Sequence, residues 1–116
     1  MIFLTVGVTS YNQFNYLNEA LNSIFDQRFI NEKEICIKVL IGHDNPKKIL
    51  KLTDLNVKNK EMITIFNHHE NLGEINNLNF LLNKCKTEWF TWLADDDLWH
   101  SNYLNSFIKR IKNHKE

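Results

Sequence analysis

Short apolar runs alternate with segments of helical spacing along the chain, and this alternation limits the folds that the chain can adopt. The apolar runs predict strands at Ile2–Val8, Ile35–Ile41, Met62–Phe66 and Trp89–Ala94. Apolar residues at helical spacing predict helices at Phe14–Phe25, Pro46–Leu52, Ile75–Leu82 and Ser101–Ile111. Strands that alternate with helices favour an α/β fold, in which helices cover both faces of a mainly parallel sheet. We therefore expect a three-layer α/β/α sandwich.

Polar residues follow each predicted strand. They are Thr9 and Tyr11 after the first strand, His43 and Asp44 after the second, Asn71 and Gly73 after the third, and Asp95, Asp96 and Asp97 after the fourth. In open parallel sheets, ligands bind outside the carboxyl ends of the strands. The sequence therefore predicts that these residues line a common ligand cleft.

Three consecutive carboxylates, Asp95, Asp96 and Asp97, directly follow the last apolar run. Adjacent anions repel one another, and a divalent cation shared with a phosphate group is a common way to offset that repulsion. Carboxylate oxygens are hard ligands that suit Mg²⁺ or Mn²⁺. The alternative is a solvated acidic turn that caps the helix beginning near Ser101, because anions are favoured at helix N-termini.

The turn after the first strand argues against two common nucleotide sites. A dinucleotide fold of the usual type needs a glycine-rich turn here, and the segment Thr9–Gln13 contains no glycine. The sequence also lacks the phosphate-loop pattern GxxxxGK followed by Ser or Thr. Because the sequence has no glycine loop that could bind a phosphate, a cation would have to bind it instead. The cleft then suits a nucleotide diphosphate that is bridged through a metal.

Length and charge place further bounds on function. The chain has 116 residues, enough for one domain. Its 14 basic residues balance 14 acidic ones, so net charge gives no general attraction to nucleic acid. No apolar run approaches the length that spans a membrane. We expect a cytoplasmic protein that does not bind nucleic acid, and we leave an association with a membrane open.

Several segments together resemble the N-terminal half of a family 2 glycosyltransferase with the GT-A fold. The matching segments, in chain order, are Val8–Asn12, Leu17–Gln27, Val39–Asn45, Asn71–Gly73 with Asn79, and Trp92–Trp99. Each segment is a weak signal alone, but the ordered set is specific and covers essentially the whole chain. The resemblance implies a Rossmann-like nucleotide-binding half, residues 1–116, that ends before the acceptor-binding half.

The resemblance also implies roles for individual residues. Thr9 and Tyr11 would line the nucleoside pocket with Asn71 and Gly73, Asp44 would accept a hydrogen bond from uracil, Asp95 would lie near the ribose or diphosphate, and Asp96 and Asp97 would hold Mn²⁺ or Mg²⁺. The implied reaction transfers a sugar from a nucleotide-diphosphate donor, a UDP-sugar by preference, to a glycan or lipid-linked acceptor. The general base for this transfer is expected beyond Glu116, so no catalytic residue is assigned.

Each assignment has a structural alternative. The Tyr11 ring could be partly packed, Asp44 could only cap a helix, and residues 71–73 could only form a turn. Three positions also depart from the family pattern, because His43 and Ala94 replace common acids and Leu78 replaces a common arginine. Base specificity could therefore differ from uracil.

Two other functions are alternatives to glycosyl transfer. One is a non-catalytic module that binds a nucleotide sugar, or a half-enzyme that needs another segment. The other is a Mg²⁺-dependent phosphate-handling enzyme, which often needs an aspartate at the end of the first strand, where Thr9-Ser10-Tyr11 has none. A donor half without its acceptor half should also expose apolar surface around the last strand and helix and self-associate. The pair His68 and His69 is expected at the surface.

Overall fold

The chain folds around a four-stranded parallel sheet. The computed structural model describes residues 1–28 and 33–114. Its strands are β1 (Ile2–Ser10), β2 (Ile35–His43), β3 (Ile63–Asn67) and β4 (Trp89–Ala94), in the spatial order β3-β2-β1-β4. Every neighbouring pair is parallel. The predicted α/β class and parallel sheet are confirmed.

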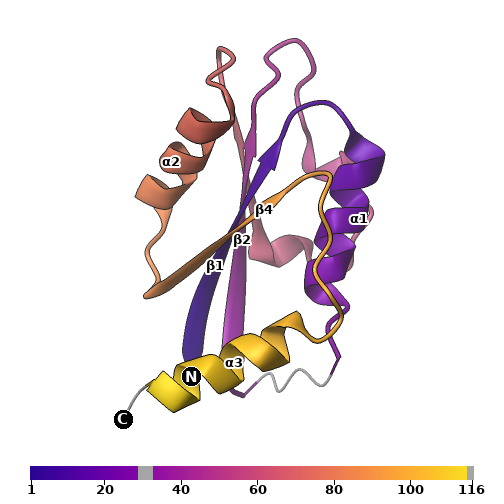
Figure 1. Cartoon of the computed structure of the whole chain (residues 1–116). Helices are drawn as coiled ribbons and strands as arrows, with labels where there is room; N and C mark the ends of the chain where they lie inside the picture. The colour runs from indigo at the N-terminus through magenta and orange to yellow at the C-terminus, as the bar shows by residue number, and fades with distance from the viewer. Residues whose placement is uncertain (29–32, 115–116) are drawn as a thin grey trace.

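Helices lie on both faces of this sheet, as predicted (Figure 1). They are α1 (Phe14–Phe25), α2 (Glu74–Lys84) and α3 (Tyr103–His114), with short 3₁₀ helices η1 (Leu52–Asp54) and η2 (Lys60–Met62) between β2 and β3. Helix α2 covers one face, and α1 covers the other, near the carboxyl ends of the strands. Helix α3 packs on the same face as α1, because its buried Leu104 and Ile108 belong to one apolar cluster with Ile24 of α1.

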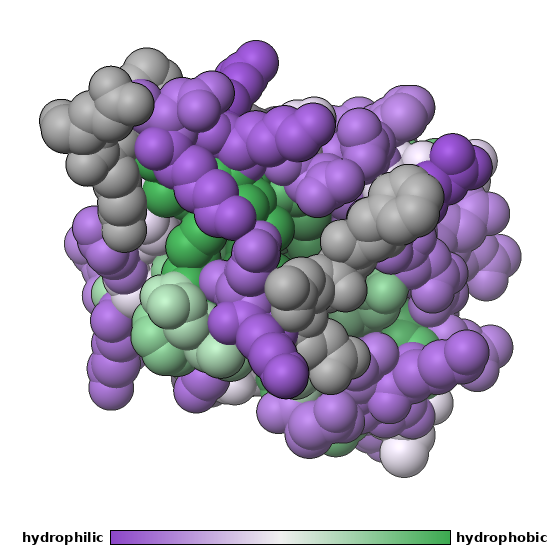
Figure 2. Space-filling view, turned by 90° about the horizontal axis from the view of Figure 1, so that it is seen from below, coloured by the Kyte–Doolittle hydropathy of each residue, from purple (hydrophilic) through white to green (hydrophobic). Residues whose placement is uncertain are grey.

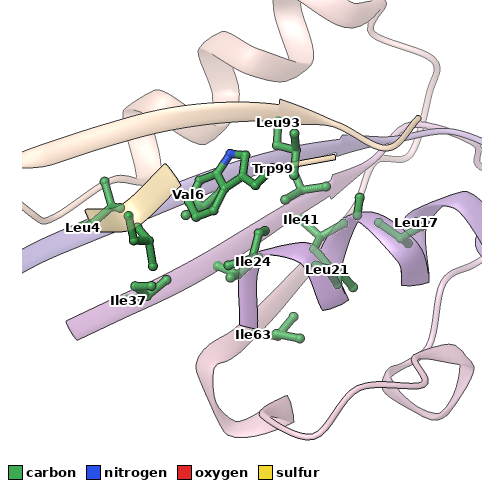
Figure 3. Close-up of a cluster of buried hydrophobic side chains, with 14 of the residues drawn as sticks. Leu4, Val6, Leu17, Leu21, Ile24, Ile37, Ile41, Ile63, Leu93 and Trp99 are labelled. Atoms are coloured by element: carbon green, nitrogen blue, oxygen red, sulfur yellow. The ribbon is translucent and has the colours of Figure 1, made fainter. Parts of the chain in front are cut away.

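Helix α1 shows why the sequence forms this core. Its Leu17, Ala20, Leu21 and Ile24 are fully buried and recur at the spacing of one helical face. Figure 3 shows Leu17, Leu21 and Ile24 against alternate residues of β1 and β2, such as Val6 and Ile41. The period of two in the strands and the period of 3.6 in the helix meet in a single apolar layer.

The predicted helix at Pro46–Leu52 is wrong, and long-range hydrogen bonds explain why. The backbone N–H and C=O of Leu50 both bond to the side-chain amide of Asn67, at 2.9 and 3.0 Å. The Lys48 carbonyl accepts from the ring of His43. These groups cannot then form the i to i−4 ladder of an α-helix. The stretch instead contains a turn closed by the Lys48 N–H and the Asn45 carbonyl, and the 3₁₀ helix Leu52–Asp54 follows it.

The helix predicted at Ile75–Leu82 is present as α2, but its buried face differs from the prediction. Ile75 and Leu82 are 67% and 50% exposed, whereas Asn77 and Leu81 are buried against the sheet. The polar Asn77 occupies the inward stripe because it has hydrogen-bond partners there, as described below.

Apolar side chains are exposed near the last strand. Trp92 of β4 is 40% exposed, and Leu98, in the loop after it, is 63% exposed. We expect the purified protein to self-associate through this surface, because burying it removes apolar area from water. Light scattering over a range of concentrations measures this, and a clean monomer at the highest concentration would contradict the expectation.

Candidate functional site

A pocket lies at the point where the chain changes direction in the sheet. From β1 the chain winds outward through β2 to β3, and it then crosses to β4 on the other side of β1. Such a switch point separates the loops that follow β1 and β4 and leaves a cleft at their carboxyl ends. A pocket of about 330 Å³ occupies this position, lined by Thr9, Ser10, Tyr11, Asp44, Asn71, Gly73, Glu74, Asn77, Ala94, Asp95 and Asp96.

Two backbone-linked contacts join the ends of β1 and β4 at the floor of the pocket. The Tyr11 N–H donates to Asp95 Oδ2 at 3.0 Å. The Asp95 N–H donates to the Thr9 carbonyl, also at 3.0 Å. Burial raises the pKa of Asp95 above its usual value; the Tyr11 N–H opposes this rise, and the nearby Asp96 carboxylate adds to it. The Asp95 carboxylate is therefore partly shielded from the water that would stabilise its negative charge.

Thr9 and Tyr11 contribute differently to the pocket. Thr9 is buried, and its Oγ1 accepts a hydrogen bond of 2.9 Å from the indole Nε1 of Trp92. The Tyr11 side chain is 50% exposed. This half-exposed ring fits both the predicted pocket position, since Tyr11 is among the lining residues, and the alternative of a partly packed ring.

Asp44 organises the wall opposite Asp95. Its carboxylate is buried and accepts the backbone N–H groups of Leu72 at 2.7 Å and Gly73 at 2.9 Å. Asn71 adds two weaker bonds, to the Asp44 carbonyl and to the Gly73 N–H. Gly73 has a φ of 84°, a conformation that favours glycine. Asp44 therefore clamps the turn before α2, and it does not cap a helix after Pro46.

The other two residues of the acidic triplet, Asp96 and Asp97, differ in their position relative to the pocket. Asp96 is exposed and lines the pocket, whereas Asp97 is exposed but lies outside the pocket lining. The Asp97 N–H closes a turn by donating to the Ala94 carbonyl at 3.0 Å. Among residues 1–28 and 33–114, no group of three or more His, Cys, Asp or Glu side chains could hold a metal ion. Within these ranges the pocket thus offers carboxylate oxygens but no group of three metal ligands.

Asn77 is a pocket residue that the sequence analysis missed. Its Nδ2 donates to the Gly42 carbonyl at 2.8 Å, and its Oδ1 lies 2.8 Å from Nε2 of His68. His68 is buried, so its predicted surface position is wrong, whereas His69 is exposed. The residue singled out in this helix, Asn79, is exposed. Asn77 lies one helical turn before the apolar Leu81, but that spacing alone does not distinguish it from a surface asparagine.

A second cleft lies at the opposite end of the sheet. Its volume is about 500 Å³, and most of its lining is apolar, including Ile24, Ile35 and Ile37. Figure 2 shows apolar side chains between polar ones at this end of the molecule. The only carboxylate in its lining is Glu61, among the residues that the structure describes. The polar groups that can recognise a charged ligand gather instead at the carboxyl ends of the strands.

Comparison with known families identifies the chain. The model of the family described as "Glycosyl transferase family 2" matches residues 5–116. The chain belongs to this family. An uncharacterised glycosyltransferase of Rickettsia felis is 28% identical over 87% of the chain, and one of Rickettsia typhi is 30% identical over 90%. The chain spans only 16% and 30% of the length of these two relatives.

Solved structures share the fold of this family 2 chain. Residues 1–349 of S. aureus TarS in complex with UDP match with a TM-score of 0.78 and 24% identity, covering 98% of this chain and 33% of that one. The mannosyltransferase PcManGT from Pyrobaculum calidifontis, in complex with GDP-Man and Mn²⁺, matches with a TM-score of 0.66 and 17% identity, covering 97% and 32%. At these identities the likeness establishes the GT-A type of fold for this chain.

None of the helices in the described part of the chain has both the length and the apolar character needed to span a bilayer.

Proposed function

We propose that this chain binds the nucleotide-diphosphate sugar, a UDP-sugar by preference, and a divalent cation for a family 2 glycosyltransferase reaction. One observation carries the proposal. Tyr11, Asp44, Asp95 and Asp96 come from the ends of three different strands and line a single pocket at the switch point of the sheet. The TarS and PcManGT structures are complexes with UDP and with GDP-Man, which supports a nucleotide ligand for this fold.

Asp44 is proposed to recognise the base. Each of its carboxylate oxygens accepts one backbone N–H, and each keeps a lone pair that can accept from a ligand. A ring N–H such as that of uracil is the donor that this arrangement suits. Thr9, Tyr11, Asn71 and Gly73 would then surround the nucleoside.

The diphosphate and the metal are proposed to lie beside Asp95 and Asp96. Mg²⁺ is usually held by one or two carboxylates together with substrate phosphates, and rarely by an all-protein cage. Asp95 and Asp96 fit that pattern, because within residues 1–28 and 33–114 they belong to no group of three possible metal ligands. Asp96 would be the principal ligand, and Asp97, which lies outside the pocket lining, would contribute only after a rearrangement of its turn. The bound cation would act as a Lewis acid on the departing diphosphate.

An inverting transfer also requires a general base for the acceptor hydroxyl. Three of the four lining carboxylates already have other tasks in this proposal, since Asp44 clamps a turn, Asp95 accepts from Tyr11 and Asp96 holds the metal. The fourth, Glu74, is exposed in the first turn of α2 and is assigned no role. We propose that the base comes from outside this pocket and that the acceptor is a glycan or a lipid-linked sugar.

Titration of UDP into the purified protein, with and without Mn²⁺, tests the proposal. We expect binding that needs the metal, and we expect the substitution Asp96→Ala to weaken it by about tenfold or more, because even indirect metal contacts are worth that much. Asp26→Ala, which removes an exposed carboxylate at the end of α1, is the matched control and should bind like the wild type. UDP affinity that ignores both Mn²⁺ and Asp96 would contradict the metal site.

A further inference from the structure

His43 is a buried imidazole directly beneath the pocket, at the last position of β2. Its exposed fraction is 0%, and both ring nitrogens have partners. Nδ1 lies 3.0 Å from Ser10 Oγ, and Nε2 lies 2.6 Å from the carbonyl oxygen of Lys48. The ring also meets the Phe14 ring edge to face, with centroids 5.5 Å apart. Such a ring has a single orientation.

The two partners of His43 also fix its tautomer. A carbonyl oxygen can only accept, so the proton of the neutral ring must be on Nε2, where it is donated to the Lys48 carbonyl. Nδ1 then carries a lone pair and accepts the hydroxyl proton of Ser10. The Ser10 hydroxyl is therefore held in one direction by a partner from the neighbouring strand.

Ser10 and Lys48 connect this ring to both walls of the pocket. Ser10 directly precedes Tyr11, and its backbone carbonyl accepts the Asp44 N–H at 2.8 Å. Lys48 lies in the loop that follows Asp44. The His43 carbonyl accepts from the His68 N–H at 3.0 Å, which links the His43 backbone to the segment after β3. The ring itself contacts the turn before Tyr11 through Ser10 Oγ and the loop after Asp44 through the Lys48 carbonyl.

We propose that His43 is a positioning residue for the nucleotide pocket and that it acts through its Nδ1 hydrogen bond to Ser10. This inference rests on the proposed function, because it concerns affinity for the nucleotide. The ring does not line the pocket; its effect is to hold the turn Thr9–Tyr11 in the orientation that the nucleotide meets.

The protonation state of His43 offers an independent readout. Burial lowers the pKa of His43 below 6.5, while the Lys48 carbonyl and the charges of Asp95 and Asp44 oppose this decrease and His68 adds to it. The Lys48 ammonium group lies over the Phe14 ring that packs against His43. Protonation of Nδ1 would remove the acceptor for Ser10. The neutral ring is thus present above pH 6.5, and the Ser10 bond is lost as the pH falls through the lowered pKa.

Two substitutions separate the two bonds of His43. The amide oxygen of Asn in His43→Asn can replace Nδ1 and keep an acceptor for Ser10, whereas the amide nitrogen of Gln in His43→Gln can replace Nε2 and keep only the donor to Lys48. We expect His43→Asn to bind UDP within about twofold of the wild type, and His43→Gln to bind about fivefold more weakly, the worth of one net hydrogen bond. Ser10→Ala should weaken binding similarly and should add nothing to His43→Gln.

The same titrations at several pH values complete the test. The ratio of wild-type to His43→Asn affinity should fall at acidic pH, because only the wild type loses the acceptor; the titration of UDP itself cancels in this ratio. Equal affinities for the two His43 variants, or a ratio that does not change with pH, would overturn the positioning role alone. Failure of the wild type to bind UDP under any condition would overturn the proposed function, and this inference with it.

Discussion

Substituting Asp44 by alanine is expected to weaken UDP binding by roughly ten- to hundredfold, the value of a hydrogen bond to a charged group. The same substitution leaves the N–H of Leu72 without its acceptor and leaves the N–H of Gly73 with Asn71 Oδ1 alone. Because an unsatisfied buried donor costs about 1–3 kcal/mol, we also expect a loss of about 1–3 kcal/mol in the free energy of unfolding. Calorimetric titration with UDP and urea denaturation measure the two effects.

Asp44→Asn separates recognition from folding. The amide keeps one acceptor oxygen for the turn at Leu72 and Gly73, so it should recover part of the stability while still lacking the carboxylate that the base requires. Asp26→Ala again serves as the distant control. An Asp44→Ala protein that binds UDP like the wild type would mean that the base does not contact this carboxylate.

Gly42→Ala is expected to be among the most destabilising single changes in the sheet. A Cβ atom at Gly42 would lie 2.0 Å from Oδ1 of Asn77, far inside van der Waals contact. Asn77 cannot move away without breaking its bonds to the Gly42 carbonyl and to His68. Overpacking and the lost hydrogen bonds together should cost about 2–4 kcal/mol of the free energy of unfolding, measured by denaturation in urea.

A double-mutant cycle provides the control for this clash. Asn77→Ala removes the obstructing side chain along with its hydrogen bonds, so Gly42→Ala should cost much less in that background. We expect a coupling of about 1 kcal/mol or more between the two positions. Strictly additive effects would show that Asn77 is not what excludes a side chain at position 42.

The strands were predictable because their environment is simple. Trp89–Ala94 is an apolar run between polar neighbours, and its predicted bounds match β4. The failure at Pro46–Leu52 has a different origin, since Asn67 and His43 take the backbone groups that a helix needs. Those partners are 17 and 5 residues away, and no local pattern reveals such competition.

The location of the pocket could be predicted because it depends on where the parallel strands end. Parallel topology alone brings Thr9, Asp44 and Asp95 to one edge of the sheet, and the pocket lies there. Topology does not decide which way a turn points, and Asp97 therefore lies outside the lining. The polar residues beneath the pocket were also hidden, because Asn77 looks like an ordinary surface asparagine until its buried partners are known.

The position of β4 has a consequence for how tightly the pocket is held together. Strand β1 has a neighbour on each side, whereas in the described part of the chain β4 pairs with β1 alone. Local opening of β4 therefore breaks one ladder where opening of β1 breaks two, and Asp95 belongs to the wall that opens more easily. A ligand that contacts both walls adds a second set of contacts between β4 and the rest of the sheet. Part of its binding free energy then suppresses local opening of β4, so occupancy of the pocket and the local stability of β4 are coupled.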